Sequence, residues 1–552
     1  MTASARTVVD DIRAHAARDP EAPALVTQSG TVSYGDFADR IERLARVLAG
    51  AGLRPDDRCV VALESGVDAV VAMNAVLRAG GAFTTIDVEQ PVRRLAVMVR
   101  GARARFQVTT AALVERLALP VGGPAILLDR LDGLPEAPPP AEIAPRTLAY
   151  ASHTSGSTGD PHAVLVEHRG FHPFLRFVAR DFELDHRTAT LQLGPLGWDA
   201  SIRDTFAPLV AGGRLILLPR STLLRPEALF DALDTYGVDT ILSTTPTFLT
   251  ALANHEGSAA RLRDLRLVGT SAESLRPFLG AGNRKLLRGR LVNLYGPTEC
   301  TVTVTRYDVP AEPDTGADLI GTPIDGARVY VLDPDMRPVA DGAVGEIHLG
   351  GLGVARGYEG EPRATAEKFL PDPFADEPGA RMYRTGDLAR RRPDGTLEFL
   401  GRKDLQIKIR GYRVEPAELE GALLAHPAVR RAAVTAAADE RGRVHLIAHV
   451  IGDLADTTDA MLRAHLALTL PPHLMPRRFV RLERFPTTRT GKVDRAALAA
   501  LAAHPSAKAP AQVGPTAKTP AAAKDMAAGA DVPDVADMAD AAVWTPARGA
   551  VR

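Results

Sequence analysis

The feature that most constrains the fold is a repeated alternation of short apolar runs with longer amphipathic stretches. The runs read as buried strands, and they lie at 59–63, 125–128, 215–218, 240–242, 265–268 and 291–294. Between them, 67–78 and 225–236 place apolar residues three and four positions apart, and glycines such as Gly80 and Gly212 follow helical patterns where helices commonly end. This alternation predicts an α/β fold with parallel-rich sheets and crossover helices.

The pattern changes twice further along the chain. From residue 327, short strands and tight turns such as Pro393-Asp394-Gly395 predict an antiparallel subdomain. After residue 403, a strand at 406–409, a helix at 415–425 and alternating apolar residues at 444–451 predict a compact α+β domain.

These changes predict three parts in a chain of 552 residues, which is too long for one core. They are a large N-terminal domain at 1–403, a small C-terminal domain at 404–500, and a tail at 501–552. The tail is rich in Ala and Pro, and Trp544 is its one aromatic residue. Such a segment buries too little apolar surface to offset its chain entropy, so we expect it to be disordered.

Composition excludes several classes of function. The chain has 66 Lys and Arg against 67 Asp and Glu, a net charge of −1, so no basic excess indicates nucleic-acid binding. Two cysteines, Cys59 and Cys300, cannot supply a disulfide framework or a four-cysteine metal cluster. No apolar run approaches the roughly 18 to 20 residues of a membrane span, and residues 1–20 lack the apolar core of a secretory signal. We therefore expect a cytoplasmic protein without a membrane partner.

One loop, which follows the apolar run 148–150, has the composition of a phosphate-binding segment. Hydroxyls and glycines packed this densely let backbone amides and side chains surround phosphate oxygens. The loop lacks the Gly-Lys-Ser/Thr ending of a Walker A motif. By itself, a flexible Ser/Gly linker explains it as well. Its residues are Thr154, Ser155, Gly156, Ser157, Thr158 and Gly159.

Further motifs follow this loop in a fixed order. They include Tyr-Gly-Pro-Thr-Glu at 295–299, Tyr-Arg-Thr-Gly-Asp-Leu at 383–388, Gly-Arg-Lys-Asp at 401–404 and Thr-Gly-Lys-Val-Asp-Arg at 490–495. Other matches lie at 32–34, 77–83, 198–201, 345–347, 355–358, 406–411 and 470–476. Over about residues 10 to 500, the series resembles the adenylate-forming superfamily of acyl- and aryl-CoA synthetases, adenylation domains and luciferases. Within it, the chain is most similar to the amino-acid adenylation domains of nonribosomal peptide synthetases.

The resemblance implies an ATP site in the large domain. The loop from Thr154 to Gly159 would hold the β- and γ-phosphates, and Glu299 would bring Mg²⁺ to them, since hard cations prefer carboxylate oxygen. Tyr295 would stack on adenine, with Thr298 also contacting the nucleotide. Asp387 would accept the ribose hydroxyls and Arg402 would reinforce the ribose and phosphate end.

The resemblance also implies a mobile small domain that acts twice. Lys492 would reach the substrate carboxylate and the α-phosphate, where a cation offsets the repulsion between two anions. Together with Glu299 and Lys408 it makes up the expected catalytic set. After the aminoacyl adenylate forms and pyrophosphate leaves, the domain would turn about Asp404 and present a second face, including Lys408 and Gly411, to a thiol acceptor.

The expected substrate is an amino acid, because Asp199 stands where the amino-acid branch of the family pairs with the substrate ammonium. A surface or helix-capping role for Asp199 is the alternative. The family's pocket pattern selects Asp199, Ala200, Arg203, Ser243, Val268, Thr270, Leu294, Val302 and Thr303, with Lys492. Arg203 could pair with a substrate carboxylate, which favours an acidic or polar side chain. It could instead turn outward to Asp204, or neutralise Asp199.

The chain departs from the family pattern at His162, where the family usually has Lys. The permanent cation is missing there, so lower ATP affinity is expected, although His162 could equally be a solvated loop residue. No carrier-protein segment follows residue 500 and no condensation motif precedes residue 10, so we expect a freestanding enzyme of nonribosomal peptide or related natural-product biosynthesis.

Such an enzyme would load the phosphopantetheine of a separate peptidyl carrier protein, and a small accessory protein is a further expected partner. Three alternatives stay open: a carrier-independent amide ligase acting on a free amine, an aryl- or acyl-CoA ligase, and a non-catalytic scaffold.

Overall fold

The computed structural model describes residues 6–155, 161–409, 411–439, 443–488 and 493–503. The predicted loop residues Gly156, Ser157, Thr158 and Gly159, and also Lys492, lie outside these ranges. Residues 504–552 of the predicted tail also lie outside them. The first three residues of the tail, 501–503, belong to helix α16 (Arg495–Ala503).

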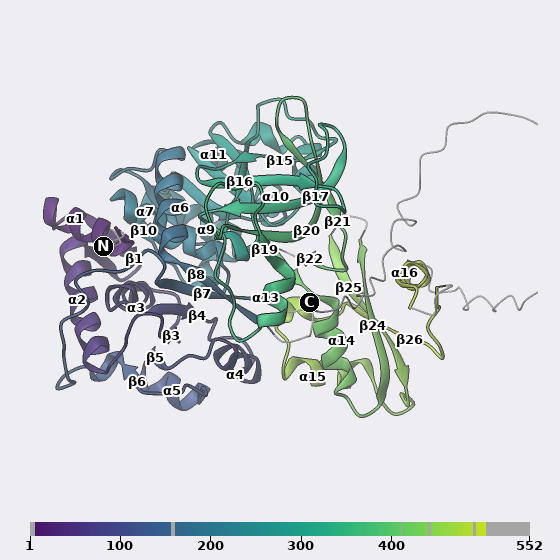
Figure 1. The fold of residues 1–552 in the computed structure, drawn as a ribbon, viewed down its shortest axis with the longest axis horizontal. Coiled ribbons are helices and arrows are strands. Elements are labelled where there is room, and N and C mark those ends of the chain that lie inside the picture. The colour runs from purple at the N-terminus through teal and green to yellow at the C-terminus, as the bar shows by residue number, and fades with distance from the viewer. Residues whose placement is uncertain (1–5, 156–160, 410, 440–442, 489–492, 504–552) are drawn as a thin grey trace, which may run out of the picture. The chain divides into compact units, whose positions relative to one another are not determined.

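The larger sheet of the described chain has fourteen strands and combines a parallel with an antiparallel part (Figure 1). In spatial order the strands are β16 (Ala327–Leu332), β17 (Val344–Gly351), β20 (Arg381–Arg391), β21 (Leu397–Arg402), β15 (Asp318–Pro323), β14 (Thr305–Asp308), β13 (Arg290–Tyr295), β12 (Leu267–Ser271), β11 (Thr240–Thr244), β9 (Ala189–Leu191), β10 (Arg214–Ile216), β1 (Pro23–Thr27) and β2 (Gly30–Ser33), with β19 (Phe369–Pro371) beside β20. Strands β13 to β1 pair in parallel, and β16 to β13 pair antiparallel.

The second sheet repeats this arrangement on a smaller scale. Its order is β18 (Gly357–Tyr358), β8 (His162–Glu167), β7 (Leu148–Thr154), β4 (Ala82–Thr85), β3 (Arg58–Val61), β5 (Phe106–Thr109) and β6 (Ala125–Leu127). Strands β7 to β6 are parallel, whereas β8 and β18 are antiparallel. In the larger sheet, the antiparallel region predicted from residue 327 joins the parallel strands through β15 and β14. The α/β class is confirmed.

Helices cover these sheets, and the periodic segments of the sequence form them. In chain order they are α1 (Val8–Arg18), α2 (Tyr34–Gly50), α3 (Val67–Arg78), α4 (Val92–Gly101), α5 (Ala111–Leu117), α6 (His168–Asp181), α7 (Ala200–Ala211), α8 (Arg220–Leu223), α9 (Pro226–Tyr236), α10 (Pro246–Ala253), α11 (Ser258–Arg263), α12 (Arg276–Gly280) and α13 (Pro362–Lys368). Gly212 ends α7 in the left-handed conformation at φ 82°, which glycine adopts without a steric penalty. Within the described residues, no helix has both the length and the apolar character needed to cross a membrane.

The C-terminal residues have their own sheets and core. Strands β22 (Ile407–Ile409) and β23 (Tyr412–Val414) pair as a two-stranded sheet. Strands β24 (Val429–Ala438), β25 (Val444–Gly452) and β26 (Arg478–Arg481) form another, packed with α14 (Pro416–Leu424) and α15 (Asp459–Ala467) around apolar side chains such as Leu419 and Leu462. The domain limits at 403 and 500 stay predictions.

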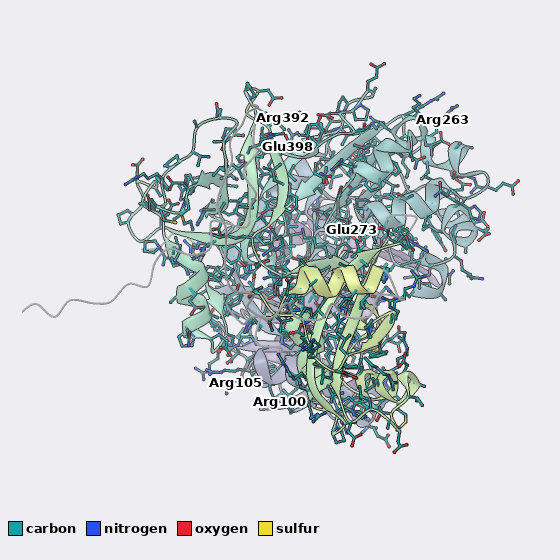
Figure 2. The ribbon with its side chains drawn as sticks, turned by 90° about the vertical axis from the view of Figure 1, so that its right-hand side faces the viewer. Arg100, Arg105, Arg263, Glu273, Arg392 and Glu398 are labelled. Atoms are coloured by element: carbon teal, nitrogen blue, oxygen red, sulfur yellow. The ribbon has the colours of Figure 1, made fainter. Side chains whose placement is uncertain are left out.

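Charged side chains pair across the antiparallel part of the large sheet. Glu398 on β21 accepts hydrogen bonds from Arg390 at 3.0 Å and from Arg392 at 3.1 Å, and Figure 2 labels Arg392 and Glu398 at this end of the sheet. These pairs connect the two strands near their turn.

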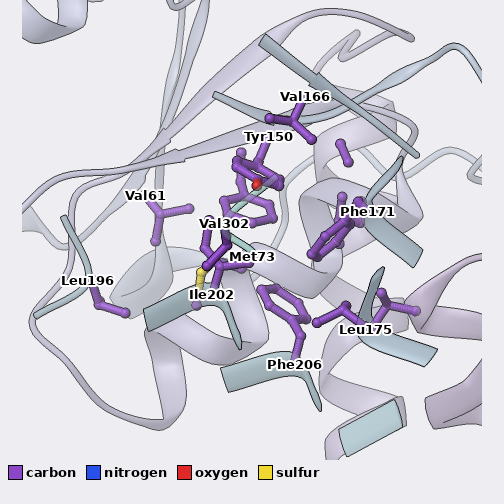
Figure 3. Packing of buried hydrophobic residues seen from close by; sticks show 14 of the residues in the cluster. Val61, Met73, Tyr150, Val166, Phe171, Leu175, Leu196, Ile202, Phe206 and Val302 are labelled. Atoms are coloured by element: carbon purple, nitrogen blue, oxygen red, sulfur yellow. The ribbon is translucent and has the colours of Figure 1, made fainter. Parts of the chain in front are cut away.

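The main core packs side chains from both sheets and from α3, α6 and α7 (Figure 3). Phe206 of α7 stacks on Phe83 with ring centroids 5.6 Å apart, and its edge meets Phe171 at 5.3 Å. Helix α7 is buried along nearly its whole length, as expected of a helix surrounded by other elements. The polar residues Arg203 and Asp204 of this helix are therefore enclosed in the protein.

Candidate active site

A cavity of about 670 Å³ opens beyond the carboxyl ends of β7, β11 and β13. Ligand sites of α/β proteins commonly lie at this edge of a parallel sheet. Many residues selected from the sequence line it. They are Thr154, Ser155, Asp199, Ala200, Ser243, Leu294, Tyr295, Thr298, Val302, Asp387, Arg402 and Lys408. Residues far apart in the sequence thus meet around one cavity.

Other selected residues lie behind the cavity wall or beside it. Glu299, Val268, Thr270, Arg203 and Thr303 are all buried without lining the cavity. Asp404 lines a neighbouring cavity of about 1220 Å³, which shares Arg402 and Lys408 with the first.

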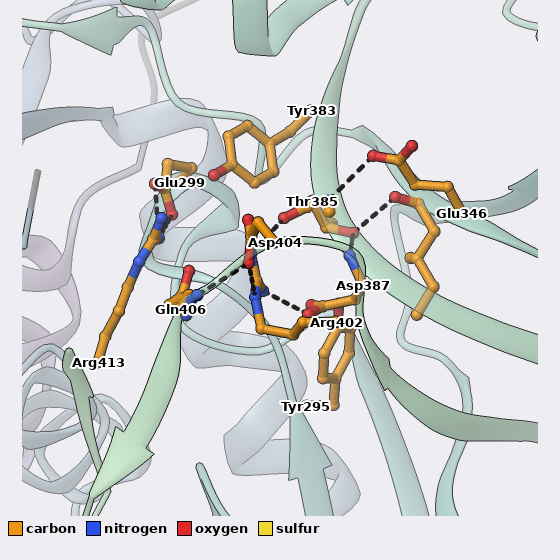
Figure 4. Close-up of polar contacts among 12 residues, drawn as sticks. Tyr295, Glu299, Glu346, Tyr383, Thr385, Asp387, Arg402, Asp404, Gln406 and Arg413 are labelled. Atoms are coloured by element: carbon orange, nitrogen blue, oxygen red, sulfur yellow. Dashed lines mark hydrogen bonds and ion pairs between the residues drawn. The ribbon is translucent and has the colours of Figure 1, made fainter. Parts of the chain in front are cut away.

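In the cavity wall, Asp387 is held between two donors. The Tyr295 hydroxyl donates to its Oδ2 at 2.6 Å, and the Arg402 guanidinium forms an ion pair with its Oδ1 (Figure 4). Arg402 also pairs with Asp404 at 2.7 Å, and this second carboxylate helps to keep the pKa of Arg402 above its usual value against the effect of burial. Burial and the nearby charge of Asp387 raise the pKa of Tyr295, so its hydroxyl stays protonated as a donor.

Glu299 is fully buried on the short 3₁₀ turn Thr298–Cys300 that follows β13. Its Oε1 accepts from the Tyr358 hydroxyl at 2.7 Å and from Arg413 Nη1 at 3.0 Å, and Oε2 lies 3.3 Å from the same nitrogen. Burial alone would raise the pKa of Glu299, but the Arg413 charge and the Tyr358 hydrogen bond bring it below its usual value. The carboxylate is therefore ionised.

Asp199 lines the same cavity and lies immediately before α7. The Thr298 hydroxyl donates to its Oδ2 at 2.6 Å, and its side chain makes no helix-capping hydrogen bond. Among the described residues, no Lys, Arg or His nitrogen forms an ion pair with it. Burial raises the pKa of Asp199, an effect that the Thr298 hydrogen bond and the more distant Arg203 charge only partly oppose.

Arg203 crosses the space between β11 and the chain after β13. Its Nε and Nη2 donate to Ser243 Oγ at 3.1 and 2.8 Å, and its Nη1 donates to Thr303 Oγ1 at 2.8 Å. It forms no ion pair with Asp199 or Asp204 in the described chain. Burial lowers the pKa of Arg203 and raises that of Asp204 to about 7, and each charge partly offsets the shift of the other.

Comparison with known families and proteins decides what this arrangement is. A family model described as AMP-binding enzyme matches residues 12–359, and one described as AMP-binding enzyme C-terminal domain matches residues 418–492. The chain belongs to the AMP-binding enzyme family. The resemblance noted in the sequence is confirmed, and the family is one of adenylate-forming, ATP-dependent ligases.

Curated relatives of this AMP-binding enzyme are nonribosomal peptide synthetases. Tyrocidine synthase 1 from Brevibacillus parabrevis is 35% identical over 87% of this chain, and a dimodular nonribosomal peptide synthase from Bacillus subtilis is 35% identical over 88%. The chain spans only 43% and 21% of these proteins, respectively.

Solved structures agree with this assignment. An NRPS protein with adenylation and PCP domains, bound to a vinylsulfonamide inhibitor, has a TM-score of 0.78 and 29% identity over 89% of this chain and 84% of its own. An artificially fused adenylation–PCP di-domain from Klebsiella oxytoca has a TM-score of 0.77 over 87% of this chain and 95% of its own; at 23% identity it supports the fold alone.

The structure of this AMP-binding enzyme adds site residues to which the sequence assigned no role. Tyr358 ends the segment 355–358, and Arg413 follows the segment 406–411 by two residues, yet only the folded chain brings both onto Glu299. His162, at the start of β8, packs its ring 5.2 Å from that of Tyr358. The available signal for these two residues was that they lie in or next to recognised motifs. Their common partner, Glu299, lies 59 and 114 positions away in the sequence.

Proposed function

We propose that this AMP-binding enzyme activates an α-amino acid as an aminoacyl adenylate, and then transfers it in trans to the phosphopantetheine thiol of a peptidyl carrier protein. The observation that supports an amino acid most directly is Asp199: a partly buried carboxylate in the cavity wall with one hydroxyl donor and no cationic partner among the described residues. Burying a carboxylate without a counter-ion is costly, and a substrate ammonium would offset that cost. Aryl and fatty acids have no such cation.

ATP would bind in the same cavity, beside Asp387. The second lone pairs of the Asp387 carboxylate oxygens are suited to ribose hydroxyls, because Tyr295 and Arg402 already fix the carboxylate in place. Thr154 and Ser155 line the same cavity at the end of β7, which suits hydroxyl contacts to phosphate oxygens.

Glu299 fits a magnesium ion bound jointly with substrate phosphates. Within the described residues, no group of three or more His, Cys, Asp or Glu side chains could hold a metal alone. Mg²⁺ is commonly bound by one or two carboxylates plus phosphates and water. When bound, it would neutralise phosphate charge. The protein's part is to supply one ionised, hydrogen-bonded carboxylate at a fixed position.

The first reaction needs no general base, because an α-carboxylate is ionised at pH 7. One carboxylate oxygen attacks the α-phosphorus, and the bond from that phosphorus to the pyrophosphate oxygen breaks. Asp199 would hold the ammonium so that the carboxylate faces the nucleotide, and Lys492 would offset the meeting of two anions. Catalysis then depends on positioning and charge compensation.

In the second reaction the thiol sulfur would attack the acyl carbon, the thiol proton would be lost and AMP would leave. We propose that residues 404–500 move as a unit about Asp404, and that Lys408 belongs to the face then presented to the acceptor. Lys408 already lines the cavity, where burial lowers its pKa. The adenylation and PCP domains named together in the solved relatives support a carrier-protein acceptor.

For the substrate side chain, we propose an acidic or strongly polar group. Arg203 spends three of its five N–H groups on Ser243 and Thr303, leaving one on each terminal nitrogen for a carboxylate or amide oxygen. Ser243 separates Arg203 from the cavity, so binding requires the Ser243 side chain to yield space.

The deciding experiment is substrate-dependent exchange of labelled pyrophosphate into ATP, run across the common amino acids and a panel of aryl and fatty acids. We expect exchange with one acidic or polar amino acid, and none in a Lys492→Ala variant. Transfer of the label from that amino acid to a separate carrier protein would complete the assignment. Exchange with an aryl or fatty acid alone would contradict it.

A further inference from the structure

Helix α4 lies beside both described ends of the phosphate loop. His153 Nε2 donates to the Met98 carbonyl oxygen of this helix at 2.9 Å, and His153 directly precedes Thr154 at the end of β7. On the other side of the loop, a Cβ atom at Gly101 of α4 would lie 3.5 Å from the Pro161 carbonyl oxygen. The face of α4 that meets β7 is therefore close to the place where the proposed function puts the ATP phosphates.

Arg94 lies one turn before Met98 on the same face of α4, and it lines the cavity. Its Nη1 forms an ion pair with Glu418 on α14. Its Nε is buried without a hydrogen-bond partner, and its Nη2 makes no hydrogen bond in the part of the chain that the structure describes. A guanidinium can present two parallel N–H donors to a carboxylate or phosphate along one edge. The edge formed by Nε and Nη2 of Arg94 is not used within the described residues.

Burial makes an unused guanidinium edge unfavourable. The Arg94 side chain is only 13% exposed, and that of Glu418 is 3% exposed. A buried donor without a partner destabilises the free protein, and a charge-assisted hydrogen bond to a ligand oxygen offsets this cost. Glu418 fixes the guanidinium through Nη1 and leaves the opposite edge available. The geometry therefore favours an anionic ligand at Arg94.

Neighbouring basic side chains are less suited to such a ligand. Arg402 and Arg413 already pair with carboxylates of the site. Burial lowers the pKa of His153 to about 4, and the nearby charge of Arg94 contributes to this shift, so His153 is neutral at pH 7. His162, which follows the loop, is a histidine and supplies no permanent positive charge at this pH. Arg94 is thus a permanent cation beside the loop with donors to spare.

We propose that Arg94 binds the phosphates of ATP that leave as pyrophosphate, through its Nε and Nη2 donors, and that Glu418 is the positioning residue that orients it. Arg94 then supplies the permanent positive charge that His162 does not. This inference rests on the proposed function, because it takes the cavity beside Thr154 and Ser155 as the phosphate site.

A cation at this position acts on the first reaction. As the bond from the α-phosphorus to the pyrophosphate oxygen breaks, negative charge develops on the leaving group, and a fixed guanidinium stabilises it. The same contact acts in the reverse reaction, when pyrophosphate binds. AMP lacks these two phosphates, so its binding is independent of Arg94.

The test measures binding of ATP, pyrophosphate and AMP by isothermal titration calorimetry, with Mg²⁺ and without any acid substrate, in the full chain and in Arg94→Gln. We expect the Kd of ATP and of pyrophosphate to rise about tenfold in Arg94→Gln, because a bidentate charge-assisted contact is lost. The Kd of AMP should not change. Arg94→Lys, which keeps the charge but not the paired donors, should lie between the two.

Two control variants separate phosphate binding from a structural role. Arg93→Gln removes the same charge from the neighbouring position of α4, and Arg93 is exposed and does not line the cavity. It should bind all three ligands as the unchanged chain does. Glu418→Gln removes the orienting carboxylate but keeps the guanidinium, so ATP binding should weaken only about threefold. If Arg94 served only to pair with Glu418, Arg94→Gln and Glu418→Gln would have equal effects.

A rescue experiment tests the charge directly. His162→Lys places a permanent cation beside the loop, so adding it to Arg94→Gln should restore most of the lost affinity for ATP and pyrophosphate. A cation at position 162 does not replace a purely structural arginine on α4. Thermal melts of each variant confirm that it is folded.

Three results overturn the inference. In a folded Arg94→Gln variant, unchanged binding of ATP and pyrophosphate contradicts it, and so does an equal loss of AMP binding. Failure of His162→Lys to restore binding also contradicts it. Normal ATP and pyrophosphate binding combined with slower loading of a carrier protein would assign Arg94 to the phosphate of the phosphopantetheine acceptor instead.

The outcomes separate this inference from the proposed function. If no acid supports pyrophosphate exchange in the unchanged chain, the proposed function fails, while the binding titrations, which need no acid, still decide whether Arg94 contacts the phosphates. If exchange with an amino acid is normal and Arg94→Gln binds ATP and pyrophosphate as tightly as the unchanged chain, only the inference fails.

Discussion

Two carboxylates that line the same cavity are held very differently. Asp387 has a tyrosine hydroxyl on one oxygen and a guanidinium on the other. Asp199 has a single threonine hydroxyl, and its pKa is raised by burial. In the proposed function, the nucleotide side of the cavity is thus complete before any ligand arrives, whereas the amino-acid side leaves a charge for its ligand to balance. An enzyme with one constant substrate and one selected substrate benefits from this division, because only the second must discriminate.

The largest expected effect comes from removing the charge of Asp199, the carboxylate with a single hydroxyl donor. Asp199→Asn should lower kcat/KM for the amino acid about a hundred- to a thousandfold, since losing one partner of a buried charge pair costs about 2 to 5 kcal/mol. Because the free protein loses an unpaired, partly buried charge, its melting temperature should stay the same or rise. Pyrophosphate exchange and thermal melts of the same samples check both parts. A marked fall in melting temperature would mean that Asp199 already has a structural partner.

The corresponding change at Asp387, the carboxylate with two donors, should lower the stability of the folded protein. Asp387→Asn leaves Arg402 without one of its two carboxylates, so the free energy of unfolding should fall by about 2 kcal/mol. The KM for ATP should rise about tenfold, with a smaller effect on the KM for the amino acid. Denaturant unfolding and exchange kinetics measure these changes. Equal stability losses in Asp387→Asn and Asp199→Asn would remove the contrast between the two carboxylates.

A smaller effect is expected at Arg203, which does not line the cavity itself but contacts Ser243 in its wall. Arg203→Ala should raise the KM for an acidic amino acid about tenfold and leave the KM for ATP unchanged, because a charge-assisted hydrogen bond contributes roughly 1.5 to 3 kcal/mol. Ser243→Ala is the matched variant, since it keeps the guanidinium and removes only the hydroxyl that covers it. If Arg203→Ala alters neither KM, the guanidinium has a structural role only, linking Ser243 on β11 to Thr303.

The last expected effect concerns pH. The Asp204 carboxyl has a pKa of about 7 in the folded protein against 3.8 for an ordinary Asp, so between these values the folded state binds more protons than the unfolded state. Stability contributed by this group therefore falls as pH rises from about 4 to 7, by at most about 1.4 kcal/mol per unit. Asp204→Asn should flatten that part of the profile. Denaturant unfolding at several pH values compares the two proteins, and identical slopes would contradict the assigned burial effect.

Local sequence signals predicted where helices and strands lie along the chain. They predicted less well which of these elements lie side by side in the fold. The amphipathic pattern at 67–78 coincides with α3, and Gly212 ends α7 as its position suggested. That the antiparallel strands continue the parallel sheet through β13 and β14 could not be predicted, because strand order depends on contacts between distant segments. Periodicity reports burial and says little about which strand lies beside which.

For the site, too, the sequence indicated candidate residues better than it indicated their contacts. Motif order selected Tyr295, Asp387 and Arg402 as candidates, and the structure places them in direct contact. The sequence did not indicate that Arg203 would be screened from the cavity by Ser243, or that Arg413 would pair with Glu299. Both depend on the distance between side chains on separate elements, which residue types and spacing do not determine.

The strand order of the large sheet also dictates where the chain can be divided for expression. Strands β20 and β21 lie between β17 and β15, so a fragment ending near residue 359, where the AMP-binding family match stops, would lack two interior strands. Two new unpaired edges would then face each other across an empty slot, and exposed edges of this kind pair with other molecules and aggregate. A useful truncation has to retain β21, which ends at Arg402, one residue before the predicted domain limit.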